Sequence, residues 1–137
     1  MKDNNCIFCK IAAGEIPSKT LYEDEKFRVI LDLGPATKGH GLILPKNHFA
    51  NLYELPEETA GDVMKLAKKM ATIMTDRLGC QGFNLVQNNG EVAGQTVFHF
   101  HMHLIPRYEN DGHIIEWEPA SPTQEELEEI KDLITRD

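Results

Sequence analysis

GQTVFHFHMHLIPR, residues 94–107, contains three of the six histidines of this 137-residue chain, each separated from the next by one apolar residue. Side chains point alternately to the two faces of a β-strand. If Val97–Pro106 is extended, its apolar face consists of Phe98, Phe100, Met102 and Leu104, and its other face of His99, His101 and His103. The alternation therefore predicts a strand that packs one face into the core and carries chemistry on the other.

Other parts of the sequence predict four further strands and three helices. Strand-like runs lie at Thr20–Glu23, Phe27–Asp32, Gly41–Pro45 and Gly82–Gln87. Helical patterns lie at Ile7–Ala13, from Pro56 to about Leu78, and over about 123–136. Too few helices lie between strands for a doubly wound parallel sheet. We therefore expect an α+β fold, with an antiparallel sheet of about five strands, one long helix and one or two short helices.

The long helix is expected to pack against the apolar face of the histidine strand. Pro56 followed by two glutamates is typical of a helix start. Apolar residues then recur on one stripe, at Val63, Ala67, Met70 and Met74. The terminal helix begins with a capping-box pattern, Thr123 followed three residues later by Glu126. Its apolar face consists of Leu127, Ile130, Leu133 and Ile134.

Length and charge restrict the classes of function. A chain of this length is expected to form one domain, 1–137, with its core in about 6–108 and an acidic helix in about 123–136. The formal net charge is −8. Because no basic stripe is present, we expect no nucleic-acid partner and no anionic membrane partner. The N-terminus lacks a signal-peptide apolar region and no run approaches membrane-spanning length, which predicts a cytoplasmic protein.

The cysteines predict a metal site near the N-terminus. Cys6 and Cys9 form a C-x-x-C pair, and Cys80 is isolated in the sequence. The strand–helix context of a redox motif is missing before the pair, whereas its spacing is typical of two of the four ligands of a zinc site. Two histidines could complete a tetrahedron, and the spacing does not choose among the six.

The histidine strand itself allows two chemical interpretations. The three imidazoles could converge on one catalytic Zn²⁺ with an open position for water. Alternatively, one imidazole could attack phosphorus as a nucleophile, with its other nitrogen held by a partner and anion donors beside it. The second interpretation is favoured, because the glycine-containing turn Gly94-Gln95-Thr96 directly precedes the strand and can present backbone N–H groups to a phosphate. His40, between two glycines before another strand, adds a further imidazole.

Several spaced motifs resemble the histidine-triad (HIT) superfamily. The motif His-φ-His-φ-His-φ-φ, where φ is apolar, is matched by residues 99–105. Three upstream segments match in the right order: LDLGP at 31–35, GHGLILPK at 39–46, and NNG at 88–90 with GQT at 94–96. The resemblance covers about residues 6–108, is closest to the short bacterial Hit and Hint-like proteins, and implies a HIT-like fold.

The resemblance implies a nucleotide hydrolase that acts at the α-phosphorus. His101 would be the nucleophile that forms a covalent nucleotidyl-histidine intermediate. His103 and His40 would orient it and bind phosphate oxygens, and Thr96 would hydrogen-bond near the leaving group. The nucleotide-binding residues implied by the resemblance are Asp32, Asn88, Gly94 and Gln95.

The resemblance also bears on the substrate, the metal and the assembly. Asp32 and Asn88 fit the branch that cleaves purine nucleoside phosphoramidates; at position 88 the dinucleoside polyphosphate hydrolases typically carry Gln. Such an Ap4A-type hydrolase, or a nucleotide-binding interaction module with little turnover, is the alternative. Relatives with a cysteine pair bind a structural Zn²⁺ through ligands that match Cys6, Cys9, His48 and His99, and no cofactor is expected for the chemistry itself. A homodimer is implied by resemblance alone.

Overall fold

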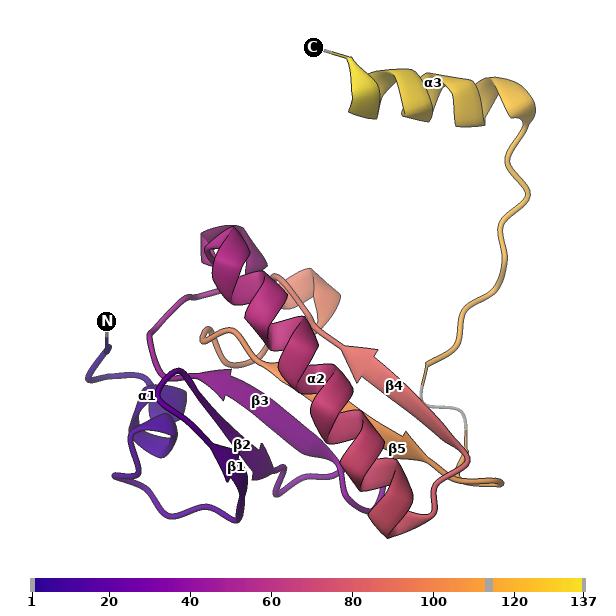
Figure 1. Cartoon of the computed structure of the whole chain (residues 1–137). Helices are drawn as coiled ribbons and strands as arrows, with labels where there is room; N and C mark the ends of the chain where they lie inside the picture. Colours follow the sequence, from indigo (N-terminus) through magenta and orange to yellow (C-terminus); the bar gives the residue numbers. More distant parts are fainter. Residues whose placement is uncertain (1, 113–114, 137) are drawn as a thin grey trace.

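Five antiparallel strands form one sheet in the order β1-β2-β3-β5-β4 (Figure 1). The computed structural model describes residues 2–112 and 115–136. The strands are β1 (Thr20–Glu23), β2 (Phe27–Leu31), β3 (Gly41–Pro45), β4 (Gly82–Val86) and β5 (Met102–Arg107). The helices are α1 (Ile7–Ala12), α2 (Glu57–Leu78) and α3 (Gln124–Thr135), with short 3-10 turns η1 (Leu52–Glu54) and η2 (Glu91–Ala93). The α+β class and the number of strands are confirmed.

The two faces of the sheet are covered by different helices. In β3, Ile43 points into the main core beneath α2, whereas Leu42 and Leu44 pack with α1 on the opposite face. This division follows from the alternation of side chains along a strand that is buried on both sides. Figure 1 shows α2 crossing one face of the sheet, with α1 beside β3 and β2.

The apolar stripe of α2 builds the main core, as the sequence predicts. The buried residues of this helix are Val63, Leu66, Ala67, Met70 and Met74. They pack with Phe100 and Leu104, which belong to the predicted apolar face of the histidine segment. Gly79 ends the helix with a φ of +68°, a left-handed conformation that glycine adopts readily.

The histidine strand is shorter than the sequence predicts. β5 begins at Met102, so the expected strand Val97–Pro106 is wrong in its first half. The Gln95 amide holds the Val97 carbonyl at 3.1 Å, and the Phe100 N–H donates to the Phe49 carbonyl at 2.6 Å instead of a strand ladder. Phe98 is consequently 49% exposed and not part of the core. Phe100 is nevertheless buried in the main core, as the sequence predicts.

The C-terminal helix lies away from the rest of the chain in Figure 1. Thr123 and Glu126 form the predicted capping box, each side chain bonding to the other residue's backbone N–H. Every residue from Gln124 to Arg136 is exposed. None of the helices in the described ranges is both long and apolar enough to cross a membrane.

Candidate active site and metal centre

Four imidazoles gather on the sheet face that carries α1. His103 lies in β5 and pairs with Leu42 of β3, and His40 directly precedes β3. His99 and His101 lie in the irregular segment before β5, and both are buried. Antiparallel pairing of β3 with β5 therefore joins histidines that are more than sixty residues apart in the sequence.

The tautomer of His101 leaves a free lone pair on its Nε2. The Nδ1 of His101 lies 2.7 Å from the carbonyl oxygen of His99. A carbonyl only accepts, so Nδ1 carries the hydrogen and Nε2 keeps its lone pair. Burial lowers the pKa of His101, more than the nearby Asp32 charge raises it. The ring is thus neutral at physiological pH, the form that can attack an electrophile.

A chain of hydrogen bonds sets the tautomers of His40 and His103. The Ala36 N–H donates to His40 Nδ1 at 2.9 Å, so the hydrogen of His40 resides on Nε2. That Nε2 donates to His103 Nδ1 at 2.9 Å, which leaves the hydrogen of His103 on its own Nε2. Burial, reinforced by the neighbouring His101 and His40, lowers the pKa of His103 to about 4. His103 can therefore donate a hydrogen bond to an anion while remaining neutral.

Asp32 lies beside this chain. Its Oδ2 is 3.6 Å from His40 Nε2, and its Oδ1 accepts the Gly34 N–H at 2.8 Å. Asp32, His40 and His103 thus offer ligand atoms within 4.8 Å of one another. A metal bound by these three residues would need a lone pair on His40 Nε2. Because the Ala36 N–H donates to His40 Nδ1, the ring hydrogen lies on Nε2 and no lone pair is available there. This trio is accordingly a hydrogen-bonded cluster in the structure.

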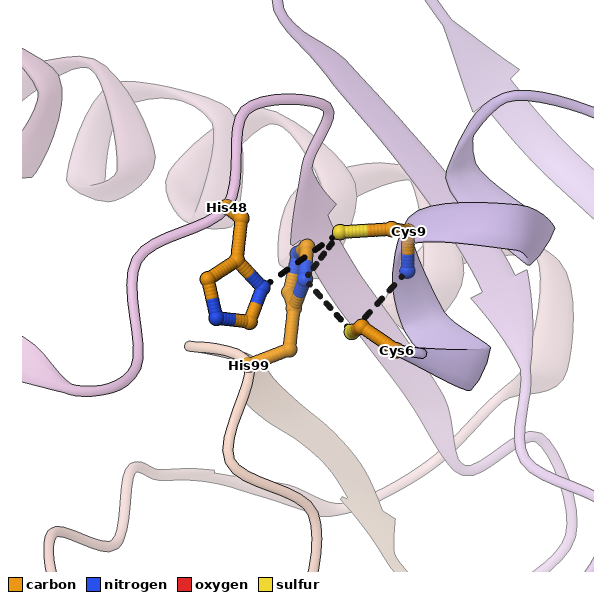
Figure 2. A group of neighbouring side chains, drawn as sticks. All are labelled: Cys6, Cys9, His48 and His99. Carbon is orange, nitrogen blue, oxygen red and sulfur yellow. Dashed lines mark hydrogen bonds between the residues drawn. The ribbon is translucent and has the colours of Figure 1, made fainter. Parts of the chain in front are cut away.

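A second cluster brings together Cys6, Cys9, His48 and His99, whose ligand atoms all lie within 4.8 Å of one another (Figure 2). His99 Nδ1 lies 3.3 Å from the Cys6 sulfur and 3.4 Å from the Cys9 sulfur. His48 Nδ1 lies 3.4 Å from the Cys9 sulfur. These are the four residues that the family resemblance implied, and they come from the start of α1 and its N-cap, the segment after β3, and the segment before β5.

The chemistry of this cluster fits zinc. His99 Nε2 donates to the Pro45 carbonyl at 2.8 Å, so the lone pair on Nδ1 faces the two sulfurs. Burial and the backbone bond to Pro45 fix this ring, which is fully buried. Two thiols and two imidazoles form a common tetrahedral ligand set for Zn²⁺. The three histidines of the predicted strand do not form one ligand group, because His99 groups with the cysteines and His48 whereas His103 groups with Asp32 and His40.

Phe8 lies against the rings of His99 and His101, and the sequence offered only a weak signal for it. It lies between Cys6 and Cys9 in α1. Its ring meets the His101 ring at 4.9 Å between centroids and 87° between planes, and the His99 ring at 6.1 Å. Ala36 was also missed, because it acts through its backbone N–H and no side-chain pattern marks such a role.

The loop before the histidine segment is held by Gln95. Its Oε1 accepts the Gly90 N–H at 2.9 Å, and its Nε2 donates to the Ala50 and Val97 carbonyls. The side chain is 2% exposed, so it builds the loop from within. The N–H groups of Gly94 and Gln95 donate to carbonyls of the same loop. Of the three residues expected to present backbone donors, only Thr96 keeps an N–H without a partner among the described residues.

Asn88 lies against this loop. A Cβ built on Gly94, whose φ is +98°, would come within 3.5 Å of Asn88 Nδ2. Glycine at position 94 permits the left-handed turn, and a Cβ there would be in ordinary van der Waals contact with Asn88. Two of the expected nucleotide-binding residues are brought together in this way.

Comparison with known proteins agrees with this geometry. A model of the HIT domain matches residues 13–110. The chain belongs to the HIT family. The protein hit of Bacillus subtilis is 44% identical over 135 residues, which cover 96% of this chain and 93% of that relative. The adenosine 5′-monophosphoramidase of Saccharomyces cerevisiae is 45% identical over 122 residues, which cover 88% of this chain and 74% of the yeast protein.

Solved structures of other proteins share the fold. A protein from Streptococcus mutans aligns with a TM-score of 0.94 and 39% identity, over 98% of this chain and 86% of that one. A zinc-bound histidine-triad protein from Mycobacterium smegmatis aligns with a TM-score of 0.76 and 38% identity, over 84% of each chain. The resemblance to the HIT superfamily, close to bacterial Hit proteins, is confirmed.

Proposed function

We propose that this HIT protein hydrolyses purine nucleoside phosphoramidates at the α-phosphorus through a covalent nucleotidyl-His101 intermediate. The observation that carries the proposal is the 2.7 Å bond from His101 Nδ1 to the His99 carbonyl, which leaves Nε2 as the attacking atom. The yeast relative, named as an adenosine 5′-monophosphoramidase, supports the choice of substrate.

In the first step, the Nε2 lone pair of His101 forms a bond to phosphorus while the bond from phosphorus to the leaving nitrogen breaks. The leaving amine takes a proton from solvent as it departs, and nucleotide remains on the imidazole; the water that attacks in the second step returns one proton to solvent. Water then attacks phosphorus, the bond to Nε2 breaks, and free nucleotide is released with the ring restored. His103 Nε2–H and the Thr96 N–H are the donors available to the phosphate oxygens in both steps.

We assign the surrounding residues their roles from the hydrogen-bonding atoms that each still has available for a ligand. Asp32 retains its Oδ2 for a ribose hydroxyl, because Oδ1 is held by the Gly34 N–H. Asn88 lies at the same loop and would contact ribose or phosphate. The Thr96 hydroxyl is exposed and suits a contact near the leaving group. Gln95 and Gly94 would act by shaping the loop, since their donors are engaged within it.

We further propose that Cys6, Cys9, His48 and His99 hold one structural Zn²⁺ per chain. When bound, the ion would supply rigidity, tying α1 to the segment before β5, and no reaction step passes through it. The donor set and its close spacing support this site, as does the zinc-bound Mycobacterium smegmatis relative.

A homodimer is part of the proposal. Among the residues that the structure describes, β4 is an edge strand that pairs only with β5, so its other edge could pair with a second copy. Sedimentation at several protein concentrations tests the assembly.

The decisive experiment compares turnover of adenosine 5′-phosphoramidate and diadenosine tetraphosphate under the same conditions. We expect faster turnover of the phosphoramidate, with rapid formation of an acid-labile nucleotidyl-enzyme before steady state. Faster turnover of the tetraphosphate would favour the dinucleoside polyphosphate hydrolases. Absence of both turnover and burst would favour a nucleotide-binding interaction module.

A further inference from the structure

The C-terminal helix is built to pack against something that its own chain does not provide. The side chains of its apolar face remain about half exposed or more: Leu127 48%, Ile130 54%, Leu133 53% and Ile134 75%. An isolated helix of 12 residues is marginal in water even when its sequence favours helix. A capping box and a continuous apolar face therefore indicate a helix that is stabilised by tertiary packing.

The connector leads α3 away from its own body. Residues 115–123 form neither helix nor strand, and they include Pro119 and Pro122. Proline favours an extended backbone and stiffens such a segment. Nine extended residues span up to about 30 Å, which is far enough to reach a neighbouring molecule. Figure 1 shows this extended path and the helix at its end.

The C-terminal helix falls within an alignment with a homologous structure. The alignment with the Streptococcus mutans structure covers 98% of this chain, which leaves out fewer residues than the 12 of α3. The helix thus falls within a superposition whose TM-score is 0.94. Because every residue of α3 is exposed, the surface that would bury its apolar face has to come from outside the described body of the chain.

Charge complementarity between α3 and α2 indicates which surface would bind the C-terminal helix. The polar side of α3 is acidic, with five carboxylates against one lysine: Glu125, Glu126, Glu128, Glu129 and Asp132, with Lys131. On the body of the chain, α2 exposes three lysines that have no carboxylate partner among the described residues: Lys65, Lys68 and Lys69. The same helix exposes Met64 and Ile73 beside them. A second copy therefore offers both apolar contacts and the opposite charge.

We propose that α3 docks on a second copy of this chain, so that each subunit of the dimer holds the C-terminal helix of the other. The inference rests on the homodimer of the proposed function and not on its chemistry. Leu127 and Ile130 would be buried against the partner, and the extended connector would cross between subunits.

The test compares two double variants of the full chain, each of which adds two negative charges to α3. Leu127→Glu/Ile130→Glu places them on the apolar face, and the control Gln124→Glu/Thr135→Glu places the same number outside it. Amide hydrogen exchange of α3 is measured alongside sedimentation over a range of concentrations. In the wild-type dimer we expect α3 to exchange at least about tenfold more slowly than in Leu127→Glu/Ile130→Glu, with slow exchange retained in the control.

Two results would overturn the proposal. Equal exchange of α3 in the wild-type dimer and in Leu127→Glu/Ile130→Glu would show an undocked helix. Slow exchange of α3 in a species that sediments as a monomer would show docking on its own body. Turnover of adenosine 5′-phosphoramidate on the same samples separates the questions, because an inactive wild type counts against the proposed chemistry and leaves the exchange result unaffected.

Discussion

His99 holds His101 through its backbone: the carbonyl of His99 accepts the Nδ1–H of His101 at 2.7 Å, while the His99 ring turns its own Nδ1 toward the two cysteines. His99 therefore contributes to both sites, through its backbone carbonyl at one and its imidazole ring at the other. The side chain belongs to the metal cluster, and the main chain fixes the tautomer of the proposed nucleophile.

His101→Ala should lose activity by about three orders of magnitude or more, because a covalent route needs the nucleophile. The stability of the fold should fall far less than the activity. Single-turnover rates on adenosine 5′-phosphoramidate and trapping of the nucleotidyl-enzyme measure the effect. Near-wild-type turnover in this variant would disprove covalent catalysis by His101.

His40→Ala should reduce turnover by about 10- to 100-fold, because His103 would lose the donor to its Nδ1 and with it a fixed tautomer. His40→Gln keeps an N–H donor near that position and should recover part of the loss. Nitrogen NMR shifts of the His103 ring report its tautomer in both variants. An unchanged tautomer in His40→Ala would refute the relay from Ala36 to His103.

Acidification should destabilise the fold between about pH 6.5 and pH 4. Burial lowers the pKa of His103 to about 4 from an ordinary value of 6.5. In that interval the unfolded chain binds more protons than the folded one, so stability falls as pH falls. His103→Gln removes the titrating ring and should flatten this part of the curve in chemical denaturation. The same slope in both proteins would contradict a buried neutral His103.

Activity should persist below the pH at which a free imidazole is half protonated. The pKa of His101 is lowered by burial, so its neutral form is maintained at more acidic pH. A profile of kcat/KM should therefore fall on the acid side at a pH below 6.5. A midpoint above 6.5 that tracks protonation of the His101 ring by NMR would be the opposite result.

Cys6→Ser and Cys9→Ser should each lower the zinc content and the thermal stability of the purified protein. Cys80→Ser is the matched control, because Cys80 is also a buried free cysteine but lies outside the cluster. Metal analysis and thermal unfolding with and without a chelator measure both effects. Equal zinc content in all three variants would exclude Cys6 and Cys9 as ligands.

Sequence reasoning located the strands and the long helix because their patterns are local. Alternation marked β3, and the stripe from Val63 to Met74 marked the buried side of α2. The same alternation overextended β5 toward Val97, because apolar periodicity does not show that the Gln95 amide and the Phe49 carbonyl take the backbone groups of that segment.

Sequence reasoning named residues of the candidate site, but it did not reveal the hydrogen bonds that hold them. The family resemblance, and not motif spacing alone, assigned the histidines and cysteines to two groups. The structure brings together Cys6, Cys9, His48 and His99, and separately Asp32, His40 and His103. Gln95 was expected to bind the nucleotide. In the structure its side-chain amide is hydrogen-bonded to the backbone of Gly90, Ala50 and Val97. Backbone donors such as the Ala36 N–H leave no trace in residue identity, so their roles emerge only from coordinates.

The bond between His101 and the His99 carbonyl has a consequence for how such a protein can change over generations. The acceptor is a main-chain oxygen, present whatever side chain occupies position 99. Descendants could therefore replace metal ligands one at a time without forfeiting the nucleophile's tautomer, provided the local backbone path is kept. Selection could then act separately on the proposed metal site and on the proposed reaction, even though the two meet in a single residue.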